Sequence, residues 1–415
     1  MTGYYRSQYE SKGRKFFYTL TQFEVSLLLP YCARGFLNNW TPVCQATAAR
    51  RAFPCWDEPL LKATFKINMI SRADTVNVSN MPIDSEEEYK PGSESGTTVP
   101  PLSEWFSALT LEDENASNKW KISRFETTPL MSSYIVAYAN GNFAHLESSY
   151  TSPLSGKTRP LRVYTTPNLI HQAQFALDVK AKVLPIYETV FDVEYPLPKL
   201  DTLVAHDFDA GAMENWGLIT GRTSAFLLDP KHTDMAAKQR VVSTQSHEVA
   251  HMWFGNIVTM EWWDNLYLNE GFATVMGEVI IVDKIYPEWK VYASFITEHL
   301  NDALRLDAKL SSHPIEVDCP DANQINQIFD SLSYSKAGSC LRMLSDFVGE
   351  ELFLKGVSIY LKKRLYGNSV TNDLWEGISE ATGRDIPKIM QNWVSKVRPC
   401  IMSWSGLLTI IRPFR

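Results

Sequence analysis

Residues 235–254 read MAAKQRVVSTQSHEVAHMWF, and Gly255-Asn256 follows directly. Apolar side chains recur at helical spacing through this stretch, and glycine followed by asparagine is typical of a helix end. Inside it lies His247-Glu248-Val249-Ala250-His251. Because residues four apart share one face of a helix, both imidazoles can point at a single metal ion. The stretch therefore predicts a metal-binding helix, in which Glu248 can reach a water beside the metal.

A third metal ligand is expected from the next helix. Zinc in catalytic sites has three protein ligands and keeps one position open. Glu270 stands nineteen positions after His251 and opens a helix predicted over residues 268–285. An antiparallel helix pair can deliver its carboxylate to the histidines, although alone it would be an ordinary first-turn glutamate favoured by the helix dipole. Asp264 has two interpretations, as the partner of a ligating histidine or as a helix N-cap.

Bulk properties restrict the class of protein. The chain has 415 residues, which predicts two or three domains. A formal net charge of −7 disfavours nucleic acid as a partner. No apolar run approaches the ~20 residues of a membrane helix, and the polar start does not resemble a signal peptide. The six scattered cysteines fit free thiols in a reducing compartment, so a cytoplasmic location without a membrane partner is expected.

Periodicity separates a β-rich part from a helical part. Short alternating runs at residues 63–69 and 133–138 predict strands, and residues 84–119 predict an exposed loop. Helical spacing begins near residue 170, where residues 171–183 predict a helix. Residues 321–398 are predicted to be helical throughout.

Several segments together resemble a known family. Gly211-Ala212-Met213-Glu214-Asn215 precedes the histidine helix, and Tyr334-Ser335-Lys336 follows it. With the two histidines and Glu270, they resemble the gluzincin zinc aminopeptidases of the aminopeptidase N and puromycin-sensitive type, and are most similar to fungal cytosolic members. The flanking runs at residues 49–59 and 262–271 match the same family.

The resemblance implies an α+β fold. An incomplete N-terminal β-sheet domain, residues 1–148, is expected to precede a mostly helical thermolysin-like zinc peptidase domain, residues 149–397. Residues 398–415 form an atypical tail. Met1 matches an internal position of the family's first domain, and relatives continue beyond residue 397, so the chain is expected to be truncated at both ends.

The resemblance also implies a function: a zinc metallo-aminopeptidase that releases N-terminal amino acids from peptides through attack by a metal-activated water. One Zn²⁺ per chain is expected on His247, His251 and Glu270, with Glu248 as general base. The hydroxyl of Tyr334 is expected to stabilise the oxyanion. The motif near residue 211 implies a substrate site, in which Glu214 pairs with the free α-ammonium group. The residues expected beside it are Gly211, Ala212, Met213 and Asn215.

The sequence departs from the family pattern at the segment that supplies a second amine-binding group in relatives. Relatives supply it from a continuous run, whereas here residues 25–45 separate Thr21-Gln22-Phe23-Glu24 from Ala46-Thr47-Ala48-Ala49-Arg50. Either Glu24 or Gln45 can supply the group. The ends of the insertion can be encoded like the ends of an intron, so we hypothesise an unspliced intron. Absence of the insertion from the mature transcript would support this hypothesis, and its retention would contradict it.

Three other functions compete with the aminopeptidase as interpretations of the sequence. A truncated chain can bind zinc and peptides without turnover. An epoxide hydrolase resembling leukotriene hydrolase shares the zinc site, but that enzyme has glycine where this chain has Ala212. A thermolysin-like endopeptidase is disfavoured by Glu214, which suits a free amine.

Overall fold

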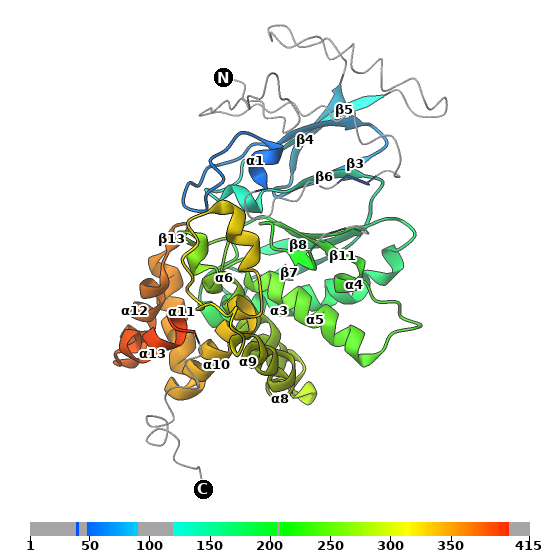
Figure 1. Cartoon of the computed structure of the whole chain (residues 1–415). Coiled ribbons are helices and arrows are strands. Elements are labelled where there is room, and N and C mark those ends of the chain that lie inside the picture. Colours follow the sequence, from blue (N-terminus) through cyan, green and yellow to red (C-terminus); the bar gives the residue numbers. More distant parts are fainter. Residues whose placement is uncertain (1–38, 41–47, 90–118, 206–207, 209, 398–415) are drawn as a thin grey trace. The chain divides into compact units, whose positions relative to one another are not determined.

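The computed structural model describes residues 39–40, 48–89, 119–205, 208 and 210–397. Their contacts divide the chain into two compact units, between which the chain passes more than once. The β-rich unit comprises Met1–Ser149, Arg159–Asp178 and Pro196–Thr233. The helical unit comprises Tyr150–Thr158, Val179–Tyr195 and Asp234–Arg415. Figure 1 labels the main elements of both units.

Two three-stranded sheets form the N-terminal part of the β-rich unit. Their strand orders are β1-β6-β3 and β2-β5-β4, and every neighbouring pair in them is antiparallel. The strands are β1 (Asn39–Trp40), β2 (Asn68–Arg72), β3 (Val76–Ser79), β4 (Ile83–Tyr89), β5 (Trp120–Phe125) and β6 (Tyr138–Gly141).

A five-stranded sheet completes this unit, in the order β10-β11-β9-β8-β7. Strand β9 is buried along nearly its whole length and pairs in parallel with β8 and β11, as expected of a central strand. Strand β10 pairs with β11 in the antiparallel direction. The bounds are β7 (Ala144–Thr151), β8 (Thr158–Thr165), β9 (Leu200–Ala205), β10 (Ala212–Met213) and β11 (Leu218–Arg222).

The strand predicted over residues 133–138 is wrong. Ser133–Ile135 forms a 3-10 turn, and β6 begins only at Tyr138. Residues 133–138 are all buried, so the alternation does not separate a core face from a solvent face. The hydroxyl of Ser133 donates a hydrogen bond to Asp57 Oδ1 at 3.0 Å, so this buried side chain is held by a residue distant in sequence.

The loop predicted over residues 84–119 begins too early. Residues up to Tyr89 continue strand β4, which pairs with β5, and residues 90–118 lie outside the described part. Cross-strand ion pairs explain how so acidic a segment forms a strand: Glu86 meets Lys121 at 3.0 Å, and Glu87 meets Arg124 at 2.6 Å. The strand predicted over residues 63–69 is extended but joins a ladder only at its ends, in the Ala63–Met131 bridge and in β2.

The helical unit confirms the main helix predictions. Helix α5 (Met235–Ala250) carries the histidine motif, and α3 (Gln174–Phe191) covers most of the segment predicted from residue 171. The helix predicted over residues 268–285 is one continuous rod of three pieces: α6 (Tyr267–Phe272), the π-helix η4 (Ala273–Ile280) and α7 (Ile281–Ile285).

The rest of this unit is also helical. One exception to the predicted all-helical C-terminal segment is the short strand β13 (Asn368–Ser369), which pairs in parallel with β12 (Thr259–Met260). The helices are η5 (Pro287–Trp289), α8 (Val291–Phe295), η6 (Ile296–Leu300), α9 (Asn301–Asp307), η7 (Ala322–Gln327), η8 (Leu332–Lys336), α10 (Ala337–Val348), α11 (Glu350–Lys363), α12 (Thr371–Thr382) and α13 (Ile386–Val394). The predicted α+β fold is confirmed.

Aromatic side chains fill the core behind the histidine helix. Phe254 stacks on Phe272 with ring centroids 4.4 Å apart, and Phe191 meets both Trp253 and Phe254. Tyr187 donates a hydrogen bond to the carbonyl of Ser246 at 2.9 Å. Buried aromatic pairs of this kind stabilise by about 0.5–1.5 kcal/mol each beyond their area, so the end of α5 is held firmly.

Within the described ranges, no helix is both long and apolar enough to cross a membrane.

Candidate metal and catalytic site

Helix α5 brings its two histidines together. Asp234 caps the start of the helix: its Oδ1 accepts a hydrogen bond from the amide of Ala237 at 2.7 Å. His247 lies in the last turn and His251 caps the end, so both side chains project from one face. Their Nε2 atoms are 3.1 Å apart.

Glu270 completes the cluster from helix α6. Its Oε2 lies 3.4 Å from Nε2 of His247 and 3.3 Å from Nε2 of His251. One ligand atom from each of the three residues lies within 4.8 Å of the others. The side chains are 12%, 2% and 6% exposed for His247, His251 and Glu270 respectively, so little water screens them. The predicted ligand set therefore converges on one point.

Hydrogen bonds on the far side of each ring fix its tautomer. Nδ1 of His247 is 3.0 Å from Glu278 Oε1, and Nδ1 of His251 is 2.9 Å from the carbonyl oxygen of Phe254. Carboxylates and carbonyls only accept hydrogen bonds, so each Nδ1 carries the proton. Nε2 is therefore the nitrogen of each ring that is left to bind a divalent metal, and both Nε2 atoms face Glu270.

Electrostatics favour positive charge at this point. Burial alone would lower the pKa of His247, but hydrogen bonds to Glu270 and Glu278 outweigh it and hold the pKa well above its usual value. Burial would raise the pKa of Glu270, yet the two histidines lower it. Two imidazoles and a buried carboxylate that face one point are a donor set that fits zinc.

Glu248 and Tyr334 lie at the same cluster. Glu248 follows His247 on α5 and is 6% exposed. Tyr334 lies on η8, and its ring is nearly parallel to that of His247, with an angle of 12° and centroids 6.3 Å apart. The structure thus places the Tyr334 ring beside a predicted metal ligand, and the charge of Glu248 is near enough to raise the pKa of His247.

Gly277 allows the close approach that builds this site. A Cβ at this position would lie 2.6 Å from Cα of His247 and 2.7 Å from its amide nitrogen. Real Cβ atoms do not approach backbone atoms so closely, so a side chain here would push η4 away from α5. The glycine lets the next residue, Glu278, reach His247.

The predicted amine-binding residues lie in the β-rich unit. Ala212 and Met213 form strand β10, and the carbonyl of Gly211 accepts a hydrogen bond from the amide of Arg222 at 3.0 Å. Glu214 is 5% exposed, and Asn215 Oδ1 accepts a hydrogen bond from Thr220 at 2.9 Å. The metal cluster belongs to the helical unit.

The other two candidates, Glu24 and Gln45, lie outside the described residues.

Glu278, rather than Asp264, is the partner of a predicted metal-ligating histidine. Asp264 is not the partner of a ligating histidine: it lies inside the 3-10 turn η3 (Trp263–Asn265), where its Oδ1 accepts a hydrogen bond from Asn265 at 2.6 Å. It is not an N-cap either, because Trp262 precedes the turn. Glu278, eight positions after Glu270, takes the expected role for His247. Glu278 lies two turns after Glu270 in the same continuous helix, and this spacing could have identified it from the sequence.

A His-Glu-x-x-His helix completed by a glutamate from the following helix is a gluzincin type of metal site. Comparisons with known families agree: residues 175–393 match the Peptidase family M1 domain, and residues 39–99 match the Peptidase M1 N-terminal domain. The chain belongs to peptidase family M1.

Named relatives are similar along nearly all of this chain. It is 42% identical over 399 residues to the alanine/arginine aminopeptidase of Saccharomyces cerevisiae, covering 96% of this chain and 40% of that protein. It is 39% identical over 396 residues to aminopeptidase M1 of Arabidopsis thaliana, covering 95% and 39%. It is 38% identical over 398 residues to the puromycin-sensitive aminopeptidase of Caenorhabditis elegans, covering 96% and 36%. The chain thus spans about two fifths of the length of these relatives.

Proposed function

We propose that this chain is the catalytic part of a zinc-dependent aminopeptidase, a hydrolase that releases N-terminal amino acids from peptides. The observation that carries the proposal is the convergence of two Nε2 atoms and one carboxylate oxygen, from His247, His251 and Glu270. Membership of peptidase family M1 and the aminopeptidase names of the relatives support it.

The proposed cofactor is one Zn²⁺ per chain. His247, His251 and Glu270 would hold it, since two imidazoles and a carboxylate are a usual catalytic zinc set. When bound, zinc supplies Lewis-acid polarisation of a carbonyl and lowers the pKa of water.

Glu248 supplies the proton transfers in the proposed reaction. Its carboxylate is buried and adjoins a metal ligand, so it can accept a proton from the attacking water. The same carboxyl group then donates that proton to the leaving amine. General acid–base catalysis by a positioned carboxylate typically contributes about 10²–10⁴-fold in rate.

Tyr334 supplies a hydrogen-bond donor for the oxyanion. Its phenol lies at the end of a ring aligned with His247, and a hydroxyl can donate where negative charge develops on the former carbonyl oxygen. Removing one such donor from a hydrolase typically costs about 3–4 kcal/mol of transition-state stabilisation.

The proposed substrates are peptides with a free N-terminus. We assign the α-ammonium group to Glu214 on the strength of its motif, because a buried carboxylate paired with an ammonium group fixes position as well as charge. Gly211, Ala212, Met213 and Asn215 are proposed to line the substrate, and Glu24 or Gln45 to supply the second amine-binding group.

The proposed compartment is the cytoplasm. The described cysteines, Cys55, Cys319 and Cys340, are free thiols, which suits a reducing environment.

The decisive experiment measures hydrolysis of aminoacyl-naphthylamides by the purified 415-residue chain, before and after chelation and after zinc is added back. Activity should disappear on chelation and return with zinc. N-acetylated versions of the same substrates should resist cleavage. Zinc binding without hydrolysis would favour the inactive form, and cleavage of the N-acetylated substrates would contradict the aminopeptidase.

A further inference from the structure

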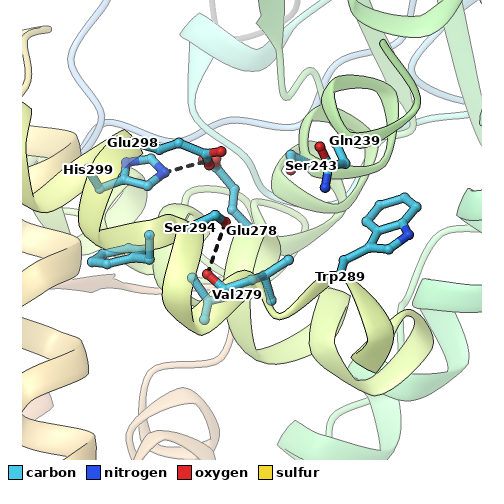
Figure 2. A pocket seen from close by; sticks show the side chains of 10 residues that line it. Gln239, Ser243, Glu278, Val279, Trp289, Ser294, Glu298 and His299 are labelled. Carbon is cyan, nitrogen blue, oxygen red and sulfur yellow. Dashed lines mark hydrogen bonds and ion pairs between the residues drawn. The ribbon is translucent and has the colours of Figure 1, made fainter. Parts of the chain in front are cut away.

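A chain of hydrogen bonds leads from the metal site to the segment that carries Tyr334. Glu278 binds His247 Nδ1 through Oε1 at 3.0 Å, and its Oε2 is 3.3 Å from Nε2 of His299. The other ring nitrogen of His299, Nδ1, is 3.1 Å from the hydroxyl of Ser335. Figure 2 shows His299 facing the Glu278 carboxylate.

Each of the three linking residues lies on a different π-helical segment. Glu278 lies on η4, His299 on η6 and Ser335 on η8. Such turns are rare, and they often occur at functional sites because the extra residue changes the direction of a side chain. Three of them in one hydrogen-bonded chain indicate that these directions matter to the site.

His299 is held in place by packing as well as by hydrogen bonds. Its ring stacks on Phe295 with centroids 4.8 Å apart, and its side chain is 15% exposed. It lines a cavity with about 340 Å³ of empty space, counting what opens to solvent, together with Glu278 and Glu298. The ring can therefore bridge two elements without being buried in the core.

We propose that His299 is a positioning residue, which ties the metal-ligating His247 to the turn carrying Tyr334 through Glu278 on one side and Ser335 on the other. This inference rests on the proposed function, because it gives His299 a role in fixing the position of the metal site relative to the oxyanion donor Tyr334.

The hydrogen-bond roles along the chain are consistent. A carboxylate accepts at both oxygens, so His247 Nδ1–H and His299 Nε2–H both donate to Glu278. With Nε2–H directed to Glu278, Nδ1 of His299 accepts from the hydroxyl of Ser335, which adjoins Tyr334. Loss of the His299 ring nitrogens would leave Glu278 free to rotate away from His247 and would release Ser335.

The test compares H299F with H299Q in the full chain. Phenylalanine keeps the ring against Phe295 but loses both hydrogen bonds, whereas glutamine keeps a donor and an acceptor. We expect H299F to weaken zinc affinity about tenfold in a chelator competition, as loss of an outer partner of a metal ligand does, and to lower kcat more than it changes KM. H299Q should restore both quantities to within about threefold of wild type.

Glu298 provides a matched control, since it adjoins His299, lines the same cavity and is exposed. E298Q should leave zinc affinity and kcat unchanged. Wild-type zinc affinity and kcat in H299F would overturn the proposal, as would equal losses in H299Q and H299F.

Ser335→Ala removes one oxygen and keeps the test open should H299F fail to fold. We expect S335A to lower kcat while leaving zinc affinity unchanged, and the H299F/S335A double variant to match H299F in kcat. Additive losses in the double variant, or a wild-type kcat in S335A, would contradict the link. A wild-type chain that binds no zinc or cleaves no substrate would instead contradict the proposed function.

Discussion

Glu248 and Tyr334 have separate roles in the proposed reaction, so replacing each should lower kcat by a different factor. E248Q keeps the shape of the side chain but cannot accept a proton, and we expect kcat to fall about 10²–10⁴-fold. Y334F keeps the ring that lies parallel to His247 but loses the donor, and we expect a fall of about 10²–10³-fold.

Both variants should retain zinc at the wild-type ratio, because neither residue is a predicted ligand. Metal analysis and steady-state kinetics on the same preparations check this prediction. A variant that keeps more than about a third of wild-type kcat would remove that residue from the proposed mechanism.

A second prediction concerns the pair formed by His313 and Asp330. Asp330 lies just before the η8 turn. Asp330 Oδ1 accepts a hydrogen bond from the amide of Leu332 at 2.8 Å, and its Oδ2 is 3.1 Å from His313 Nε2. Burial would lower the pKa of His313, but hydrogen bonds to Asp330 and the carbonyl of Pro314 outweigh it and raise the pKa. Burial would raise the pKa of Asp330, but His313 and backbone amides lower it.

The signs of these shifts define a pH window. A raised histidine pKa stabilises the fold below its unfolded value of 6.5, and this contribution is lost as pH rises through the folded pKa. A lowered aspartate pKa stabilises above 3.8 and is lost as pH falls through the folded pKa. The pair should therefore stabilise most between these values.

Urea unfolding of wild type and H313Q across pH 4–9 provides the measurement. The difference in free energy of unfolding should be largest near pH 5–6, at about 1 kcal/mol or less for a partly exposed pair, and should shrink toward pH 9. A difference that grows with rising pH would contradict the assignment.

At the scale of elements, the approach of η4 to α5 determines whether Glu278 reaches its histidine. Gly277→Ala places a methyl group against the backbone of His247, and we expect a loss of about 1–3 kcal/mol in the free energy of unfolding. Because the shifted helix carries Glu278 with it, zinc affinity should fall by about tenfold as well.

Gly356→Ala is the matched control for that variant. A Cβ at Gly356 would lie 2.5 Å from Cα of Ile378, where α11 meets α12, and neither helix carries a metal ligand. This variant should lose stability of similar size but bind zinc as the wild type does. Equal zinc affinity in both variants would show that Gly277 matters for packing alone.

The helices of the site could be predicted from sequence because their spacing is regular. His247 and His251 are four apart, and Glu270 opens the next helix, so ordinary helical geometry brings them together. The link through Glu278 and His299 could not be predicted in this way. Its members lie on π-helical turns, which change the direction of side chains relative to a 3.6-residue period.

The β-rich part was less predictable for a related reason. Alternation in residues 133–138 indicated a strand, but the whole segment is buried, and Ser133 is hydrogen-bonded to the distant Asp57. The acidic run of β4 indicated a loop, but partners on β5 neutralise it. Both errors depend on contacts with residues distant in sequence, which no local pattern contains.

At the scale of the whole molecule, metal should couple to folding, because the three ligands come together only in the folded helical unit. A ligand that binds only the native state stabilises it by about 2.7 kcal/mol at a concentration a hundredfold above its Kd. Chelation should therefore lower the transition temperature of the unit that contains the site.

Calorimetry of the 415-residue chain with and without zinc checks this coupling. The transition should rise with zinc concentration, and H247A should abolish the rise. The chain spans about two fifths of the length of its relatives, so the transition temperature of a full-length relative cannot replace this measurement. A transition that is indifferent to zinc would contradict a metal held by the folded state.

The orientations of the two imidazoles differ in their sensitivity to mutation of neighbouring residues. His247 is oriented by a side chain, Glu278, which a single codon change can delete, whereas His251 is oriented by the main-chain oxygen at Phe254, which every amino acid provides. Inherited changes that loosen the metal without touching a ligand should therefore accumulate on the side of His247. Among variants that still fold, substitutions at Glu278 should weaken zinc binding, whereas substitutions at Phe254 should cost stability but leave zinc affinity unchanged.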